Sequence, residues 1–264
     1  AKQYPAAAGR LLLEPNRSAD PHIERMIESF ALLTGRVRQK LDDEFPELSD
    51  AMLQVLYPHY LAPIPSMGVV QFVADPARTP LKDGFTIARH SRLRTRPVND
   101  QPCRYRTAYP VTLWPISLTQ ARVMPPPFPA DFRPPPGTAS ALRLSFEGQA
   151  GAKFSDLSLE RLRLHLAGDG QLVSSVYEAL CNRVIGAMLR SPDGDARKNV
   201  PLEHNGLLRP IGFESDENLL EYTTNSFPGY RLLSEFFAYP AKFWFVDLGG
   251  FREAKRAGFT RTLE

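Results

Sequence analysis

Proline is the residue that most restricts how this chain can fold. The 264 residues include 25 prolines, which is about twice the average usage. Because proline has no backbone N–H and a fixed φ, it is poorly tolerated inside helices and central strands and is common in turns, sheet edges and irregular connections. The composition therefore argues against a helical bundle and against a doubly wound parallel sheet.

The clearest helix pattern covers residues 20–45. Asp20 can cap its N-terminus, and Pro21 suits the first helical position, where the missing N–H costs nothing. Apolar residues then follow at intervals of three and four, which places them on one stripe of a helix. The stripe consists of Ile23, Met26, Ile27, Phe30, Leu33, Val37 and Leu41. We expect Pro46 to end this helix and a second helical stripe to cover residues 47–56.

Beyond the helices, the pattern changes to short strands. Pro58, Pro63 and Pro65 predict an extended, rigid connection and a boundary. Residues 125–136 form a second proline-rich connector, and 191–195 read as a turn. The predicted strands cover residues 67–73, 85–87, 93–95, 105–107, 111–118, 141–146, 162–166, 184–189 and 243–246, with one helix at 171–182. Pro115 predicts that its strand is bulged or at an edge.

Together these patterns predict an α+β fold, in which an N-terminal helical segment precedes a mainly antiparallel, β-rich body with a few helices. We expect a helical lead-in over residues 1–63, a first β-rich subdomain over 64–130 and a second α+β subdomain over 131–264. The chain begins with Ala1 and has no leader pattern. We therefore expect a piece of a longer protein, cut at both ends.

Residues that could carry chemistry are few and scattered. The sequence has no P-loop and no nucleophile elbow. Its five histidines lack metal-ligand spacing, and Cys103 and Cys181 are predicted to be buried free thiols. No apolar stretch approaches the roughly 18 residues of a membrane-spanning helix. We therefore predict no catalytic, metal-binding or cofactor-binding residues, no membrane insertion and no enzymatic activity.

The most conspicuous polar cluster is a set of alternating arginines. Arg92, Arg94 and Arg96 share one face of a strand, and Arg104 and Arg106 do the same. If these strands pair, the guanidinium groups form one patch that could bind an acidic protein surface or phosphate. The alternative is an exposed sheet face on which each arginine pairs with a nearby carboxylate. The net charge of only +3 and the absence of interleaved aromatic residues argue against nucleic acid.

Residues 20–67 resemble the N-terminal region of the TssF family, also called VasA or ImpG. The matching residues are Asp20, Pro21, Leu41, Asp42, Glu44, Phe45, Pro46, Tyr57, Pro58, His59, Tyr60, Leu61, Ala62, Pro63, Pro65, Ser66 and Met67. A second similar block covers residues 227–243, and a weaker one covers 107–115. Proteins of this family are considerably longer, so the resemblance is to an N-terminal portion.

The resemblance implies a structural wedge component of the bacterial type VI secretion baseplate, which assembles with TssG-like and TssK-like proteins. Hub and sheath proteins and a second copy of the chain are further implied partners. The implied location is the cytoplasm, in a baseplate docked at the inner-membrane complex. No enzymatic activity or cofactor goes with the family.

The interface residues expected from the sequence lie on the helix stripe and in the arginine cluster. They are Ile23, Ile27, Phe30, Val37, Arg92, Arg94 and Arg96. An alternative class is a β-sandwich carbohydrate-processing or carbohydrate-binding module, which Trp114 and Trp244 could serve. Their apolar sequence neighbours favour core packing instead.

Overall fold

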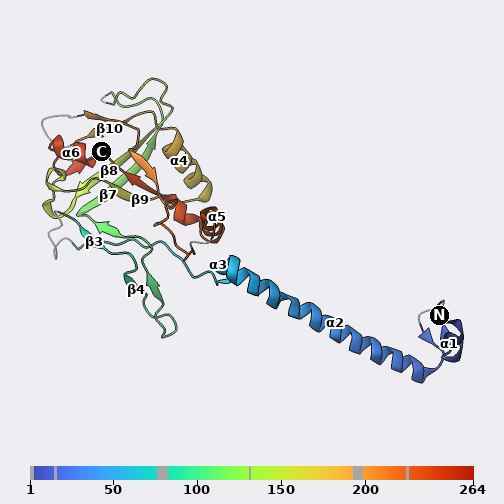
Figure 1. Cartoon of the computed structure of the whole chain (residues 1–264). Helices are drawn as coiled ribbons and strands as arrows, with labels where there is room; N and C mark the ends of the chain where they lie inside the picture. The colour runs from blue at the N-terminus through green and yellow to red at the C-terminus, as the bar shows by residue number, and fades with distance from the viewer. Residues whose placement is uncertain (1–2, 15–16, 76–82, 131, 193–198, 224–225) are drawn as a thin grey trace. The chain divides into compact units, whose positions relative to one another are not determined.

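The computed structural model describes residues 3–14, 17–75, 83–130, 132–192, 199–223 and 226–264 (Figure 1). The chain divides into two units. The first consists of Ala1–Pro63 with Thr223–Ser226, and the second consists of Ile64–Tyr222 with Phe227–Glu264.

The first unit is dominated by one long helix, α2, which spans Pro21–Leu56. It is preceded by helix α1 (Pro5–Arg10) and by the antiparallel pair β1 (Leu13–Glu14) and β2 (Arg17–Ser18). The expected cap is confirmed, because Asp20 Oδ1 accepts a hydrogen bond of 2.8 Å from the His22 N–H. A one-turn helix, α3 (Pro58–Leu61), follows α2.

Two predictions about proline in this unit are wrong. Pro46 does not end the helix: α2 runs through it without a break (Figure 1). Pro46 has no N–H to donate to the Asp42 carbonyl, but Asp42, Asp43 and Glu47 are exposed, so water can solvate that carbonyl. Pro58 begins α3 instead of an extended connection, because the fixed φ of proline also suits the first turn of a helix.

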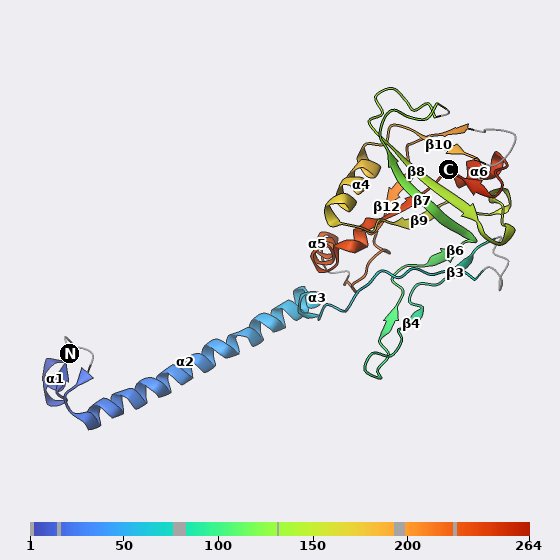
Figure 2. The same ribbon diagram turned by 180° about the vertical axis from the view of Figure 1, so that it is seen from behind.

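The second unit contains two three-stranded antiparallel sheets. One has the order β14-β8-β7, formed by Thr262–Leu263, Ala141–Gly148 and Ile116–Met124. The other has the order β12-β13-β9, formed by Leu208–Pro210, Phe245–Leu248 and Leu162–His165. β7 and β8 run side by side as long neighbouring strands (Figure 2).

Shorter elements complete this unit. Three antiparallel pairs join β3 (Phe85–Ile87) with β6 (Val111–Leu113), β4 (Arg92–Arg94) with β5 (Arg104–Arg106), and β10 (Ala187–Arg190) with β11 (Asn199–Leu202). The α-helices are α4 (Gly170–Asn182), α5 (Pro228–Ala238) and α6 (Phe251–Arg256). The short 3-10 helices are η1 (Gln149–Gly151), η2 (Phe154–Asp156) and η3 (Pro240–Trp244). The predicted α+β class is confirmed.

Several predicted elements differ in detail. The strand expected over 111–118 is two strands, β6 and β7, with Trp114 and Pro115 between them, because proline cannot donate to the ladder. Residues 67–73 form no strand. Phe243 and Trp244 belong to η3, so the strand there begins at Phe245. Helix α5 was not predicted from the sequence. The turn expected at 191–195 lies partly outside the described residues.

The main core of the second unit lies where the β14-β8-β7 sheet meets η2 and α6. Its buried members are Phe146, Phe154, Leu157, Leu159, Leu189, Phe251, Ala254, Phe259 and Leu263. Trp114 packs against this cluster, as the sequence predicted. The domain boundaries at 63 and 130 stay predictions, although β7 and β8 pair across residue 130.

Both cysteines are free thiols, as predicted, but Cys103 is exposed and Cys181 is half-buried. Cys103 follows the tip of the β4–β5 hairpin, where little of the chain covers it, so the expected burial is wrong.

Candidate protein-binding surfaces

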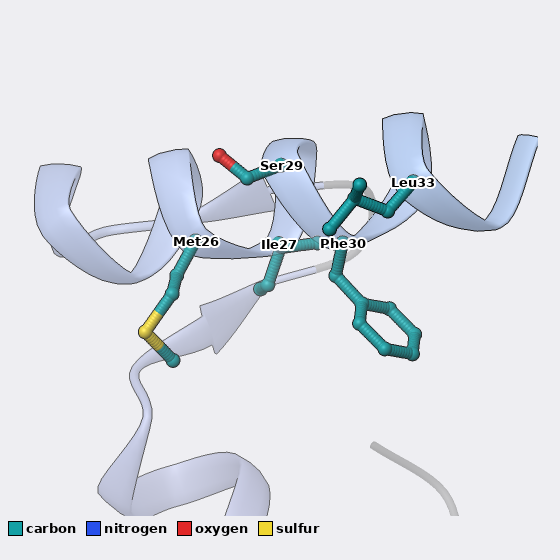
Figure 3. Close-up of a pocket in the computed structure, with 5 residues that line it drawn as sticks. All are labelled: Met26, Ile27, Ser29, Phe30 and Leu33. Carbon is teal, nitrogen blue, oxygen red and sulfur yellow. The ribbon is translucent and has the colours of Figure 1, made fainter. Parts of the chain in front are cut away.

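The apolar stripe of α2 is exposed along most of the helix. Ile23 is half-buried, whereas Ile27, Phe30 and Val37 are exposed, with 72% of Phe30 accessible. Met26, Ile27 and Phe30 project from the same side of the helix, while Ser29 points away (Figure 3). The remaining exposed apolar residues on this helix include Leu33, Leu41, Leu48, Met52 and Val55. We call this stripe the α2 face.

The α2 face has the spacing of a coiled-coil seam. Ile23, Phe30 and Val37 repeat every seven residues, and Leu41, Leu48 and Val55 do the same in a second series. A seven-residue repeat keeps an apolar seam in register with a partner helix when the two supercoil. With 36 residues and a rise of about 1.5 Å per residue, the helix is about 54 Å long. The α2 face is thus suited to pack against other helices.

The arginine cluster lies on a hairpin in which β4 pairs with β5, so the condition for a shared arginine patch is met. Arg92 lies opposite Arg106, and Arg94 lies opposite Arg104. Arg96 lies just beyond β4. Asn99 and Asp100 form the two-residue turn, with φ of 49° and 62°. Two consecutive left-handed residues are typical of a type I′ turn. The Val98–Gln101 bridge beside this turn is one residue out of register with the β4–β5 pairs, so the ladder is interrupted near Arg96. We call these five arginines the arginine face.

The alternative interpretation was that each arginine pairs with a nearby carboxylate. This is true of one residue of the arginine face. Arg106 donates to Glu221 Oε1 at 2.8 Å, and this hydrogen bond lowers the pKa of the Glu221 carboxyl. Among the described residues, the side chains of Arg92, Arg94, Arg96 and Arg104 have no ion pair or hydrogen bond. The arginine face therefore carries an unneutralised excess of positive charge.

Helix α5 has its charged residues inside. Arg231 is buried, and Glu235 is fully inaccessible and pairs with Lys242 of η3, which is 1% exposed. Burial lowers the pKa of Lys242, and its hydrogen bond to the Glu235 carboxylate opposes that shift. A buried charge is tolerated only when it is paired and hydrogen-bonded, so these residues form an interior ion network.

This network binds the backbone of residues 212–220. Glu235 Oε1 accepts from the backbone N–H groups of Leu219 and Leu220, at 2.7 and 3.0 Å. Arg231 donates to three carbonyl oxygens of the same segment, those of Phe213, Glu214 and Ser215. Glu217 Oε2 accepts from the Gly212 N–H at 2.7 Å. Glu221, whose carboxylate pairs with Arg106, follows this segment directly.

The outward side of α5 is apolar. Leu233, Phe236 and Phe237 are exposed, and 80% of Phe237 is accessible. This surface was not predicted from the sequence, because a helix with apolar and charged residues normally turns its apolar side inward. The sequence did mark this region, because the second block that resembles the TssF family, residues 227–243, contains both the buried and the exposed residues of α5.

In the part of the chain that the structure describes, no group of three or more His, Cys, Asp and Glu residues is placed to hold a metal ion. No described helix is both long enough and apolar enough to cross a membrane. The features that stand out are two exposed surfaces, the α2 face and the arginine face.

Comparison with known proteins gives a consistent result. The family model described as "Type VI secretion system, TssF" matches residues 1–264. The type VI secretion system component TssF1 of Pseudomonas aeruginosa is 40% identical over 269 aligned residues, which cover 100% of this chain and 43% of that protein.

A chain in the cryo-electron microscopy structure of a TssK-TssF-TssG baseplate subcomplex matches with a TM-score of 0.71 and 30% identity, covering 91% of this chain and 43% of that one. The chain thus spans less than half the length of either relative. With a family match over its whole length and 40% identity to a curated member, this chain belongs to the TssF family of type VI secretion system proteins.

Proposed function

We propose that this chain is part of a structural subunit of a type VI secretion baseplate and acts by binding other baseplate proteins. The α2 face is the single observation that carries this proposal. Membership of the TssF family supports it, as does the similarity to a chain from a TssK-TssF-TssG baseplate subcomplex.

The physical argument starts from the exposure of α2. Most helical stability in proteins comes from packing an amphipathic face, and the intrinsic propensity of the residues contributes little. Phe30, Leu33 and Val37 are each at least 60% accessible. Fully burying one such side chain is worth about 1.5–3 kcal/mol. A partner helix that covers the α2 face would therefore gain substantial binding energy from a few contacts.

The proposed partners are TssG-like and TssK-like baseplate proteins, with hub and sheath proteins and a second copy of the chain as further partners. Ile23, Ile27, Phe30 and Val37 make the helix contact in this proposal, and Arg92, Arg94 and Arg96 make a second one. The proposed location is the bacterial cytoplasm, in a baseplate docked at the inner-membrane complex. A role in assembly requires no catalytic residue and no cofactor.

The alternative of a carbohydrate module gains no support from the two tryptophans. Trp114 packs against the main core. Trp244 lies in η3 and is half-buried, with its ring 5.5 Å from that of Tyr177 in an edge contact. Neither residue offers the open aromatic platform on which a sugar ring would stack.

Co-purification with a TssG-like partner tests the proposal, with the mass of the complex measured by light scattering. The test variant replaces Ile27, Phe30 and Val37 by Gln. The matched control replaces Arg25, Glu28 and Arg36 by Gln on the polar side of the same helix. We expect the control to form the complex and the test variant to lose it, while both keep the wild-type circular dichroism spectrum.

We expect both variants to fold like the wild type. Glutamine is a good helix former, and the replaced apolar side chains are exposed, so the fold of the chain does not depend on them. Equal complex formation by the wild-type chain and the test variant would refute the role of the α2 face. A wild-type chain that forms no complex would refute the proposal for this segment of the protein.

A further inference from the structure

We propose that the β4–β5 hairpin binds an extended acidic segment of a partner protein, which adds as a third strand and presents a carboxylate at every second residue. This inference rests on the proposed function and deepens it, because it states the chemistry of the partner that the arginine face recognises.

The hairpin register brings the arginines close together. The Thr107 N–H donates to the Ser91 carbonyl and the Thr95 N–H donates to the Cys103 carbonyl, each at 3.0 Å. In an antiparallel ladder, hydrogen-bonded and non-hydrogen-bonded pairs alternate. The pairs Arg92–Arg106 and Arg94–Arg104 are therefore non-hydrogen-bonded, the type in which opposite Cα atoms lie about 4.5 Å apart.

This arrangement is unfavourable for the chain alone. Like charges directly opposite each other destabilise a strand pair, and a two-stranded ribbon is marginal in water. Glu221 neutralises Arg106, which leaves the Arg94–Arg104 pair and Arg92 without a counter-charge among the described residues. Carboxylates from a partner would relieve the repulsion and gain charge-assisted hydrogen bonds, which bind more strongly than neutral ones.

The hairpin is also held rigidly at its base. Thr107 Oγ1 accepts from the Ser91 N–H and donates to the Ala88 carbonyl, both at 2.9 Å. Arg89 donates to Asn218 Oδ1 at 2.6 Å. These contacts order the arginine face before a ligand arrives, and preorganisation lowers the entropic cost of binding.

The open edge of β4 supplies the backbone half of the site. β4 and β5 form a two-stranded sheet, and in the alternation above, the N–H and C=O groups of Arg92 and Arg94 point outward. An added strand would pair with these groups, which is the β-augmentation mode of peptide recognition. Its side chains on the arginine face would recur about every 6.8 Å, the same interval that separates Arg92 from Arg94. Arg106 of β5 is already engaged by Glu221, so β4 is the better edge.

The observations favour a protein segment over nucleic acid. Binding of single strands relies on aromatic side chains that stack with the bases next to the basic residues. One aromatic residue, Tyr105, does lie between Arg104 and Arg106, so the expected absence of interleaved aromatic residues is wrong at this position. It lies on the opposite face of the strand, and its hydroxyl is 3.4 Å from Ser66 Oγ. The net charge of the whole chain is only +3.

A peptide-binding experiment with the full chain tests the inference. The probe is a fluorescein-labelled decapeptide of alternating Glu and Thr. Its control, the paired peptide, has the same composition but alternates Glu-Glu and Thr-Thr pairs, so that no two Glu residues lie two positions apart on one face of a strand. The hairpin variant is Arg92→Ala/Arg94→Ala/Arg104→Ala. The matched control, Arg122→Ala/Arg133→Ala/Lys153→Ala, removes three exposed positive charges elsewhere in the same unit. Binding is followed by fluorescence anisotropy at low and physiological salt.

We expect the alternating peptide to bind about tenfold more weakly to the hairpin variant than to the wild type or the control, since three exposed ion pairs are lost. The paired peptide should bind the wild type more weakly than the alternating one, because its carboxylates on one face recur only at every fourth residue. If the hairpin variant and the control variant lose the same binding affinity, net charge alone explains the effect and the arginine face is not the site. If the two peptides bind the wild type equally, the partner does not bind as an extended strand. Tighter, hairpin-dependent binding of a thymidine decanucleotide, or full displacement of the peptide by millimolar inorganic phosphate, would also overturn the proposal.

The outcome is separable from that of the proposed function. If the hairpin variant binds the peptide like the wild type while the α2 face still forms its complex, the acidic-strand inference alone fails. If the α2-dependent complex is absent as well, the proposed function fails with it.

Discussion

Replacing Lys242 by Met tests whether the interior ion network between α5 and η3 stabilises the second unit. The substitution keeps a long unbranched side chain and removes one charge. Arg231, Lys242, Glu217 and Glu235 are all buried, with two positive and two negative groups in formal balance. The variant leaves one negative charge in excess. Glu235 loses its cationic partner, and its side chain has no access to water.

Breaking a buried pair by removing one partner costs about 3–5 kcal/mol. The backbone N–H groups of Leu219 and Leu220 still bind Glu235 in the variant, so we expect about 3 kcal/mol, the lower end of this range. Domain stabilities are about 5–15 kcal/mol, which makes the loss large. Urea denaturation followed by circular dichroism and tryptophan fluorescence measures it, and the m-value shows whether unfolding remains cooperative.

A double-mutant cycle distinguishes pairing from packing. Glu235→Gln keeps an oxygen acceptor for Leu219 and Leu220 but leaves Lys242 without its carboxylate, and it should cost a similar amount. The double variant Glu235→Gln/Lys242→Met contains neither charge and should recover about 1–3 kcal/mol relative to the sum of the single effects. Additive losses would show that the two side chains act independently and would refute the argument.

Three further predictions concern single side chains. Arg94→Thr removes a like-charge pair with Arg104 and should raise the free energy of unfolding by about 0.2–1 kcal/mol; a loss of stability in urea denaturation would contradict this. Burial raises the pKa of Tyr177 to about 12, so its stabilising contribution is complete below pH 10 and is lost as the pH rises from 10 to about 12. Tyr177→Phe should show a shallower alkaline fall in melting temperature than the wild type, and parallel curves would contradict this. Phe237→Ala should change stability by less than about 0.5 kcal/mol because the side chain is exposed, whereas Phe146→Ala in the core should cost about 3–5 kcal/mol; similar melting temperatures would refute the assignment of the core.

Much of the architecture could be predicted because the relevant information is local. The stripe from Ile23 to Leu41 specifies a helix and its apolar side through spacing alone. The alternation of Arg92, Arg94 and Arg96 likewise specified a strand and a shared face. Family membership could be inferred from the residues around Tyr57 to Met67, because a long motif leaves little room for coincidence.

Predictions from local sequence rules failed where breaking the rule costs little free energy, or where the same local conformation suits two structures. Pro46 is a poor interior helix residue, yet α2 continues through it, since the loss of one hydrogen bond on an exposed helix is limited. Pro58 has the fixed φ of an extended connection and equally that of a first helical turn, and the sequence does not distinguish the two.

The burial of Arg231 and Glu235 was decided by the tertiary structure alone. At a spacing of four, the two residues share one side of α5, and the sequence by itself predicts that this side faces water. They lie inside because Lys242 and the backbone of residues 213–220 supply their counter-charge and hydrogen bonds. The same holds for the arginine face, where only the fold brings Glu221 to Arg106 across 115 residues of sequence. Spacing along the chain determines which residues share a face, but which face is buried depends on partners that are distant in the sequence.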